Sequence, residues 1–434
     1  ELFRWSQLLV QHLVSILVRV HDEELIEGTC HALLAILDEG EDVYDAFVNA
    51  FVGVTSNLYA LVSIFRRDSV NVVEIGSELT SCLITNVYSV VRYIVETGDF
   101  LECVIGCFFR FRQSEKIAAC CCSILSSVSI VHDGYIRSVI AHGGGLSAVL
   151  EVMREHSNNP VVTIAACNAI CSLTKGLPDD MILGMREPLS VAVVRALKNN
   201  VENAEIIDAA LEIVCFLCVR DNYFKQYMSD NQIIQLVVTA MGKHLYKRSL
   251  QVQGCTCLWT LSNYGGNKVE IGSRGGLSAI LHALMAHMDA TNVQKEGLIA
   301  LKNLATTSAN KEELRRKFAQ DTIFLSIRAN YKSPTVLSAA FTALNNIFVD
   351  KQHLTVTRVA TDLLDCVLAA MKRFPHDEGV QKNACFLLKS CTYEWSNLVE
   401  MQKKKHDYMS LLTQAASRHR SQCHERAMYV LNKL

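Results

Sequence analysis

Residues 249–305 read SLQVQGCTCLWTLSNYGGNKVEIGSRGGLSAILHALMAHMDATNVQKEGLIALKNLA and decide the fold. Two passages in this stretch, CLWTLSNY (257–264) and VQKEGLIALKNLA (293–305), share one plan. In each, a small residue is followed by Leu four residues later and by Asn six residues later; these residues are Cys257, Leu261 and Asn263, then Gly297, Leu301 and Asn303. Self-similarity at a period of roughly 40 residues indicates a helical solenoid.

The pattern extends in both directions from this stretch. Units with a small first residue and apolar residues four and seven places later begin at residues 121, 166, 210, 257, 297, 340, 384 and 427, at separations of 40 to 47. Before residue 121 the repeat weakens, although TCHALLAI (29–36) fits well and a passage near Leu83 fits loosely. About ten repeats are therefore predicted, the last of them truncated.

Each repeat is predicted to be helix–turn–helix–turn–helix. The small residue and the two apolar positions fall on one stripe of the third helix, which faces the core. Gly144–Gly145 and Gly275–Gly276 fall between predicted first and second helices, where a turn needs positive φ. All five prolines fall at predicted boundaries: Pro160 and Pro334 begin third helices, Pro188 begins a second helix, and Pro178 and Pro375 lie in connections.

Composition favours a large folded core in a reducing environment. The chain is 50% hydrophobic and 20% charged, which is too apolar for disorder. Apolar runs such as CVIGCFF (103–109) fall short of the ~20 residues that span a bilayer, so membrane insertion is not expected. The 17 Cys lie mostly within apolar helical patterns, which favours a cytoplasmic location. Glu1 in place of Met is typical of a fragment.

The net charge of −2 conceals an asymmetry. Residues 1–110 carry 6 Lys and Arg against 16 Asp and Glu, whereas residues 241–434 carry 26 against 15. An acidic and a basic end favour oppositely charged partners, or head-to-tail contact between copies of the chain.

Residues 114–434 resemble armadillo repeats. CLWTLSNY and VQKEGLIALKNLA look like third helices of importin-α and β-catenin, and GSRGGLSAIL (272–281) and AHGGGLSAVL (141–150) look like the loop before the second helix. The resemblance implies an all-α, right-handed superhelical α-solenoid of about ten three-helix repeats, whose third helices line a concave groove for extended peptides. Residues 1–113 are expected to form divergent, acidic armadillo-like repeats within one continuous solenoid.

An asparagine series is the sharpest candidate site. Asn263, Asn303 and Asn346 each lie six residues past the small position in three successive repeats. A carboxamide offers an acceptor and donors together, so it can pair with the C=O and N–H of a bound peptide. The alternative is that each Asn caps its own helix end.

Trp259 lies four residues before Asn263 and is expected on the same face. In importin-α, such Trp–Asn pairs recur, and the Trp rings form slots for the stems of Lys or Arg. Here the pair occurs once, because the places equivalent to Trp259 hold other residues, which weakens an importin-type interpretation; these are Ile299, Thr342 and Phe386, the last paired with Ser390. A buried structural Trp is the alternative.

Lysines add positive charge to the same predicted surface. Lys302 and Lys389 lie on third helices and would attract acidic segments; the alternative is ordinary solvated helix surface. Farther upstream the matching places no longer hold the Asn ladder; they are Glu212 and Phe216, Asn168 and Ser172, and Ser123 and Ser127. That half is predicted to be a different surface or a structural extension.

No motif predicts catalysis, a metal or a cofactor. Cys215 and Cys218 form a CxxC without the second pair that structural zinc needs, and a role as small buried hydrophobes is expected for the cysteines. The glycine runs lack the Lys-Ser/Thr of a phosphate loop. Nucleic-acid binding is disfavoured by a pI near 6.7. Residues 403–405, three lysines, could be a nuclear signal or structural Lys.

The predicted function is a non-catalytic scaffold or adaptor that binds an extended segment of a partner protein in the groove. Adhesion, trafficking, and cytoskeletal or axonemal assembly stay open, as does association with the cytoskeleton. The first alternative is an importin-α-like adaptor that recognises basic cargo signals and shuttles to the nucleus. The second is an armadillo-type regulator of a small GTPase.

Overall fold

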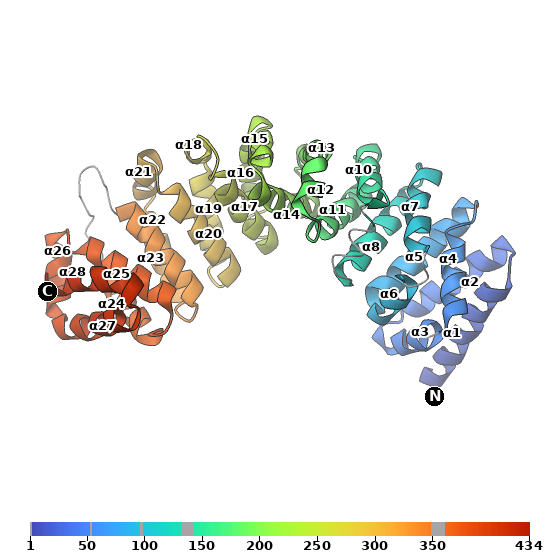
Figure 1. Cartoon of the computed structure of the whole chain (residues 1–434), viewed down its shortest axis with the longest axis horizontal. Helices are drawn as coiled ribbons and strands as arrows, with labels where there is room; N and C mark the ends of the chain where they lie inside the picture. Colours follow the sequence, from blue (N-terminus) through green and yellow to red (C-terminus); the bar gives the residue numbers. More distant parts are fainter. Residues whose placement is uncertain (1, 53, 96–98, 132–139, 141, 349–360) are drawn as a thin grey trace. The chain divides into compact units, whose positions relative to one another are not determined.

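The computed structural model describes residues 2–52, 54–95, 99–131, 140, 142–348 and 361–434. These residues form 27 α-helices and one short 3-10 helix, and no strand occurs among them (Figure 1). The predicted all-α class is confirmed.

The chain divides into two compact units, residues 1–216 and 217–434, with the division inside helix α14 (Ala204–Arg220). The two units are defined by the contacts between residues in space. The boundary predicted near residue 113 is of another kind, because it marks where the repeat becomes regular in sequence, and it stays a prediction.

In the N-terminal unit, the third helices of successive repeats pack against one another in chain order: α2 (Glu23–Leu37), α5 (Val70–Asn86), α8 (Glu115–Val131) and α11 (Pro160–Thr174). The other elements form the first and second helices, and they are α1 (Leu2–Arg19), η1 (Glu41–Val43), α3 (Tyr44–Phe51), α4 (Thr55–Ile64), α6 (Tyr88–Val95), α7 (Phe100–Arg110), α10 (Gly145–Glu155), α12 (Asp179–Gly184) and α13 (Arg186–Asn199).

The C-terminal unit has the same plan. Its third helices also pack in chain order: α17 (Arg248–Leu261), α20 (Thr291–Leu304), α23 (Pro334–Phe348), α25 (Glu378–Cys391) and α28 (Arg420–Leu431). The remaining helices are α15 (Asn222–Asp230), α16 (Ile233–Lys243), α18 (Asn267–Ser273), α19 (Gly276–Ala286), α21 (Ser308–Arg316), α22 (Ala319–Ala329), α24 (Thr361–Arg373), α26 (Trp395–Lys403) and α27 (Lys405–Arg418).

Local signals set the helix ends. Asn159 accepts hydrogen bonds from the backbone N–H groups of Val161 and Val162, and Pro160 occupies the first helical position, where a missing N–H costs nothing. Asp377 caps α25 in the same manner through the N–H of Val380. The boundaries predicted from Pro160 and Pro334 are confirmed.

The turn predicted at the two Gly-Gly pairs is confirmed. Gly144 has φ of 82° and Gly275 has φ of 86°, and each directly precedes a second helix. The same place in two neighbouring repeats holds Gln232 with φ of 63° and Phe318 with φ of 51°. The turn therefore keeps its geometry in these two repeats without glycine. This costs some backbone strain, because residues with a Cβ are disfavoured in the left-handed region.

A recurring glutamine joins the third helix to the second helix of its own repeat. The Nε2 of Gln294 donates to the carbonyls of Leu284 (2.7 Å) and His287 (2.9 Å). Gln251 and Gln381 make the same pair of bonds to residues ten and seven places earlier. Three buried side chains thus identify structurally equivalent positions in three repeats.

This equivalence corrects the register predicted for one repeat. Gln251 lies three residues before Gly254 and Gln294 lies three before Gly297, so Gly254, and not Cys257, is the small position of α17. With residue 254, the separations of 47 and 40 become 44 and 43. Thr260 is then the equivalent of Asn303, and Asn263 lies three residues beyond it.

Glycine at the small position does permit a close helix approach. A Cβ at Gly297 would lie 2.7 Å from Cδ2 of Leu284, and one at Gly254 would lie 2.5 Å from Cγ of Met241. Both neighbours belong to the second helix of the same repeat. The close approach therefore lies inside one repeat, between its second and third helices.

Among the described residues, no single helix is long and apolar enough to cross a membrane. In the part of the chain that the structure describes, one pair, α3 and α4 taken together, has the required length and composition, and the two helices are bent by 100° relative to each other.

Candidate peptide-binding face

The third helices of the C-terminal unit expose similar places. The residue two places past the small position is half-buried in α17, α20, α23 and α25, and so are one or both of the residues five and six places past it. We define the third-helix face by the half-buried residues at these places in α17, α20, α23 and α25: Thr256, Trp259, Ile299, Lys302, Asn303, Thr342, Asn346, Phe386 and Lys389.

Trp259 reaches from α17 to α20. Its Nε1 donates to Oε2 of Glu296 (3.3 Å), and Thr256 donates from its hydroxyl to the same oxygen (3.4 Å). Lys295 pairs with the other oxygen of Glu296 at 3.0 Å. The carboxylate beside the indole is therefore already paired with a cation of this chain. Glu296 was not predicted, because no sequence spacing links it to Trp259.

The three predicted asparagines have different surroundings. Nδ2 of Asn263 donates to the carbonyl of Trp259 (3.2 Å) at the end of its own helix, as in the capping interpretation. Nδ2 of Asn346 donates across repeats to the carbonyl of Lys302 (2.9 Å). Within the described part of the chain, the amide of Asn303 makes no hydrogen bond.

The α25 end of the face is occupied by interactions with α28. The guanidinium of Arg426 lies 5.0 Å from the ring centre of Phe386. Nζ of Lys389 lies 3.3 Å from Oε1 of Glu425 and 4.9 Å from the ring centre of Tyr429. Lys302 has no ion pair among the residues that the structure describes, so it is the more available of the two predicted lysines.

Ser390 is not placed as predicted. It is only 3% exposed, and its hydroxyl has two acceptors within hydrogen-bond distance, the carbonyl of Phe386 (3.1 Å) and Oδ1 of Asn345. Ile299 and Thr342 are half-buried as expected for the face. The hydroxyl of Thr342 bonds to the carbonyl of Ser338 one turn earlier (2.9 Å), which leaves its methyl group for contact.

The cysteines are mainly core residues. All 17 are free, 13 are buried, and Cys82, Cys103, Cys120 and Cys366 are half-buried. Burial raises the pKa of Cys167 and Cys255 to about 12 each, and neighbouring charges add to the rise. No group of three or more metal-ligating side chains occurs in the described ranges.

The buried thiols should react only slowly with thiol reagents in the native protein. At pH 8 in reducing-agent-free buffer, we expect the buried cysteines to react with a disulfide reagent at least ~100-fold more slowly than in 8 M urea, since reaction requires local opening. Fast reaction of all 17 before unfolding would contradict their burial.

A raised pKa of the buried thiols in the folded state also means that the unfolded chain releases these protons at lower pH than the folded chain does. The contribution of these thiols to the free energy of unfolding should therefore be constant below pH 8, and the free energy of unfolding should fall as the pH rises from about 9 to about 12.

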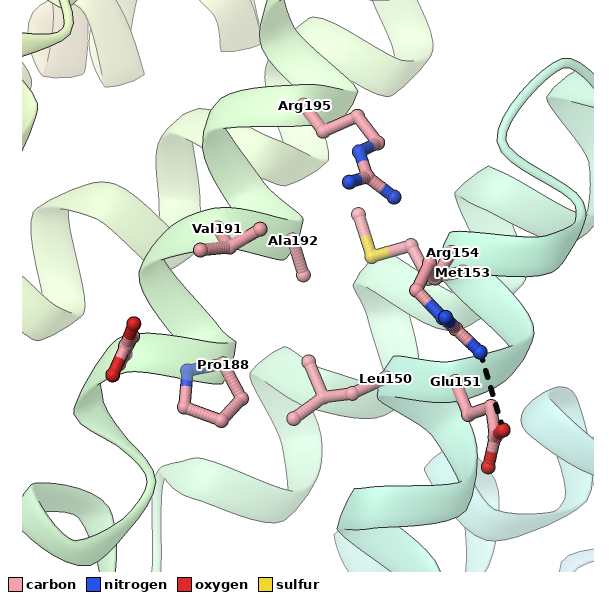
Figure 2. A pocket seen from close by; sticks show the side chains of 9 residues that line it. Leu150, Glu151, Met153, Arg154, Pro188, Val191, Ala192 and Arg195 are labelled. Carbon is pink, nitrogen blue, oxygen red and sulfur yellow. Dashed lines mark hydrogen bonds and ion pairs between the residues drawn. The ribbon is translucent and has the colours of Figure 1, made fainter.

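A cavity of about 450 Å³ lies in the N-terminal unit between α10 and α13. Figure 2 shows Leu150 and Met153 on one helix and Pro188, Val191 and Ala192 on the other. Its charged residues have both signs: Glu151 and Arg154 form an ion pair at 3.3 Å, whereas Glu187 and Arg195 lie on α13. The cavity was not predicted, because it arises from two helices about one repeat apart.

Residues 110–375 match the family model of the GAC ARM domain. Among solved structures, an engineered protein is similar over 98% of this chain and 98% of its own, with a TM-score of 0.72 and 17% identity. A structure from work on a phosphorylation switch between cadherin and β-catenin is similar over 100% of this chain and 96% of its own, with a TM-score of 0.56 and 16% identity. No curated protein matches the chain. These likenesses agree with the armadillo resemblance of the sequence.

Proposed function

Because the chain belongs to the family of GAC ARM domains, we propose that it is a non-catalytic scaffold that binds an extended segment of a partner protein. The armadillo fold supports binding of proteins in general. The solved structure that concerns cadherin and β-catenin supports this use through the fold alone, because its sequence is only 16% identical to that of this chain.

The third-helix face is the proposed binding surface, and Asn303 is the observation that carries the proposal. Its amide is half-buried on α20 and makes no hydrogen bond among the described residues. An unused donor and acceptor in a fixed position can pair with the N–H and C=O of one residue of an extended chain. Ile299 lies one helical turn earlier and offers an apolar contact beside that pair.

The charge that remains available on the face supports an acidic residue in the bound segment. Lys302 favours such a residue near Asn303, whereas Glu296 beside Trp259 is already paired with Lys295 at 3.0 Å. A face whose available charge is positive differs from an importin-type groove, which takes basic side chains through a series of Trp–Asn pairs. In the one such pair here, the amide of Asn263 donates to the carbonyl of Trp259 and is not free for a peptide. This weakens the transport alternative.

The free thiols support a reducing compartment, which is our proposal for the location.

The test compares two asparagines of the same unit. Peptides selected from a displayed library of random 12-residue sequences would be synthesised with a fluorophore and titrated with the protein. We expect Asn303→Ala to weaken binding about 5- to 10-fold, because one hydrogen-bonded pair contributes on the order of 1 kcal/mol. Asn263→Ala should bind like the original chain, since that amide already serves its own helix end.

Equal effects of the two substitutions, or no effect of Asn303→Ala on any selected peptide, would refute the third-helix face as the binding surface. Melting temperatures of both variants, measured by circular dichroism, separate a loss of binding from a loss of folding. Asn303 is half-buried and unbonded, so its removal should leave the fold intact.

A further inference from the structure

A second cavity lies in the C-terminal unit, away from the third-helix face. It has a volume of about 180 Å³ and lies between α22 and α24, which are the second helices of neighbouring repeats. Its lining is Ile327, Arg328, Tyr331, Leu337, Cys366, Ala369, Ala370 and Arg373. Ile327, Leu337 and Ala370 are 5% exposed or less and form its apolar floor.

The cavity lies where the repeat pattern changes. Leu337 lies three residues before the small position of α23, the place that Gln251, Gln294 and Gln381 hold in other repeats. Those glutamines bond to the residue ten places earlier on the second helix, and the corresponding residue here is Ile327. Leucine cannot donate such a bond. Both Leu337 and Ile327 line the cavity instead.

Two arginines flank this apolar floor, and aromatic rings hold them. The guanidinium of Arg373 lies 5.2 Å from the ring centre of Tyr331, and that of Arg328 lies 5.8 Å from the ring centre of Phe324. Neither arginine forms an ion pair within the described ranges. A guanidinium stacked on a ring keeps its N–H donors for a planar anion such as a carboxylate.

The surroundings are positive on balance. Lys332 lies 5.5 Å from the ring centre of Tyr331 and adds a third cation. None of the described residues that line the cavity is acidic. Two carboxylates of α24 lie near Cys366, and one of them, Asp365, pairs with Lys404 at 2.6 Å.

The larger cavity between α10 and α13 differs in this respect. Its Arg154 pairs with Glu151 at 3.3 Å and with Glu155 at 3.7 Å. Its lining contains both signs of charge, so its chemistry does not select an occupant. The cavity between α22 and α24 does select one, since it combines an apolar floor with cations that form no ion pair among the described residues.

We propose that the cavity between α22 and α24 is a second docking site, for an acidic segment of a partner protein. One apolar side chain of that segment enters the cavity, and Asp or Glu residues on either side of it contact Arg328 and Arg373. A cavity of about 150 Å³ is known to hold benzene, so 180 Å³ fits one such side chain. Tyr331, half exposed at the rim, offers further apolar contact.

The experiment uses the full chain and an array of nonapeptides with a central Leu, Ile, Met, Phe or Tyr and Asp or Glu at the other positions. We expect a subset to bind, and binding to weaken when the centre is Gly or when the flanks are Lys. The double substitution Arg328→Glu with Arg373→Glu should weaken the bound peptides at least ~10-fold, because both charge contacts become repulsive.

Arg154→Glu is the matched control. It removes an exposed arginine at the edge of the other cavity between second helices and should leave the affinity unchanged. Asn303→Ala should also leave it unchanged, so failure of this proposal and failure of the third-helix face are distinguishable. The proposal is overturned if no acidic peptide binds, if a central Gly binds equally well, or if the double substitution has no effect in a folded variant. Equal binding of anionic lipid vesicles or of single-stranded DNA would also overturn it.

Discussion

Replacing Gln294 with Leu should lower the free energy of unfolding of the C-terminal unit by about 2–4 kcal/mol. The side chain is fully buried and donates to two carbonyls at the end of α19, those of Leu284 and His287. Leucine would fill the same space but leave the Leu284 carbonyl without this donor in the interior, whereas the His287 carbonyl keeps its bond from the N–H of Ala290 (3.0 Å). Urea denaturation followed by circular dichroism measures the loss.

The control for this substitution is His282→Ala, an exposed site on α19. It should change the free energy of unfolding by less than ~0.5 kcal/mol. If Gln294→Leu is equally mild, water or a shifted backbone satisfies the Leu284 carbonyl, and the glutamine does not hold the second and third helices together.

Gly276→Val should destabilise the same unit by about 1–3 kcal/mol. A Cβ at this position would lie 2.4 Å from Cγ2 of Ile271 and 2.8 Å from its backbone carbonyl oxygen. A side-chain atom can move, but the backbone of α18 is fixed by its own hydrogen bonds. The contact cannot be relieved without displacing the first helix of the repeat. Thermal unfolding of the variant provides the measurement.

Gly242→Ala is the control of opposite sign. Gly242 lies inside α16, and a Cβ there would meet nothing within 4 Å. Alanine in a helix is favoured over glycine by about 0.5–1 kcal/mol, so this variant should be stabilised. Similar shifts for the two glycines would show that helix propensity alone, and not crowding at Ile271, sets the effect.

Much of the fold follows from the sequence, because an armadillo repeat repeats its local signals. The helix starts at Pro160 and Pro334 and the turns at Gly144 and Gly275 were all predictable from single residues. The register of one repeat was not. Asn263 lies six residues past a small residue, as Asn303 does, and this coincidence outweighed the buried Gln251, whose bonds define the true equivalence.

The candidate face was only partly predictable. Trp259 and Asn303 stand out as residue types at regular places. Glu296 contacts Trp259 across 37 positions of chain, and Arg426 contacts Phe386 across 40 positions. Spacing within one repeat contains no information on such contacts. The burial of Ser390 was missed for the same reason, since Asn345, which it contacts, lies on another repeat.

Two hydrogen bonds of the third-helix face, from Trp259 to Glu296 and from Asn346 to Lys302, cross from one repeat to the next, whereas those of the buried glutamines stay inside a repeat. A relative tilt of two repeats in the C-terminal unit therefore stretches the bonds from Trp259 to Glu296 and from Asn346 to Lys302, and leaves the glutamine bonds unaffected. A polypeptide laid over the same junctions resists that tilt. Elastic stiffness and ligand affinity are thus linked reciprocally: whatever bends the stack alters binding, and whatever binds restrains bending.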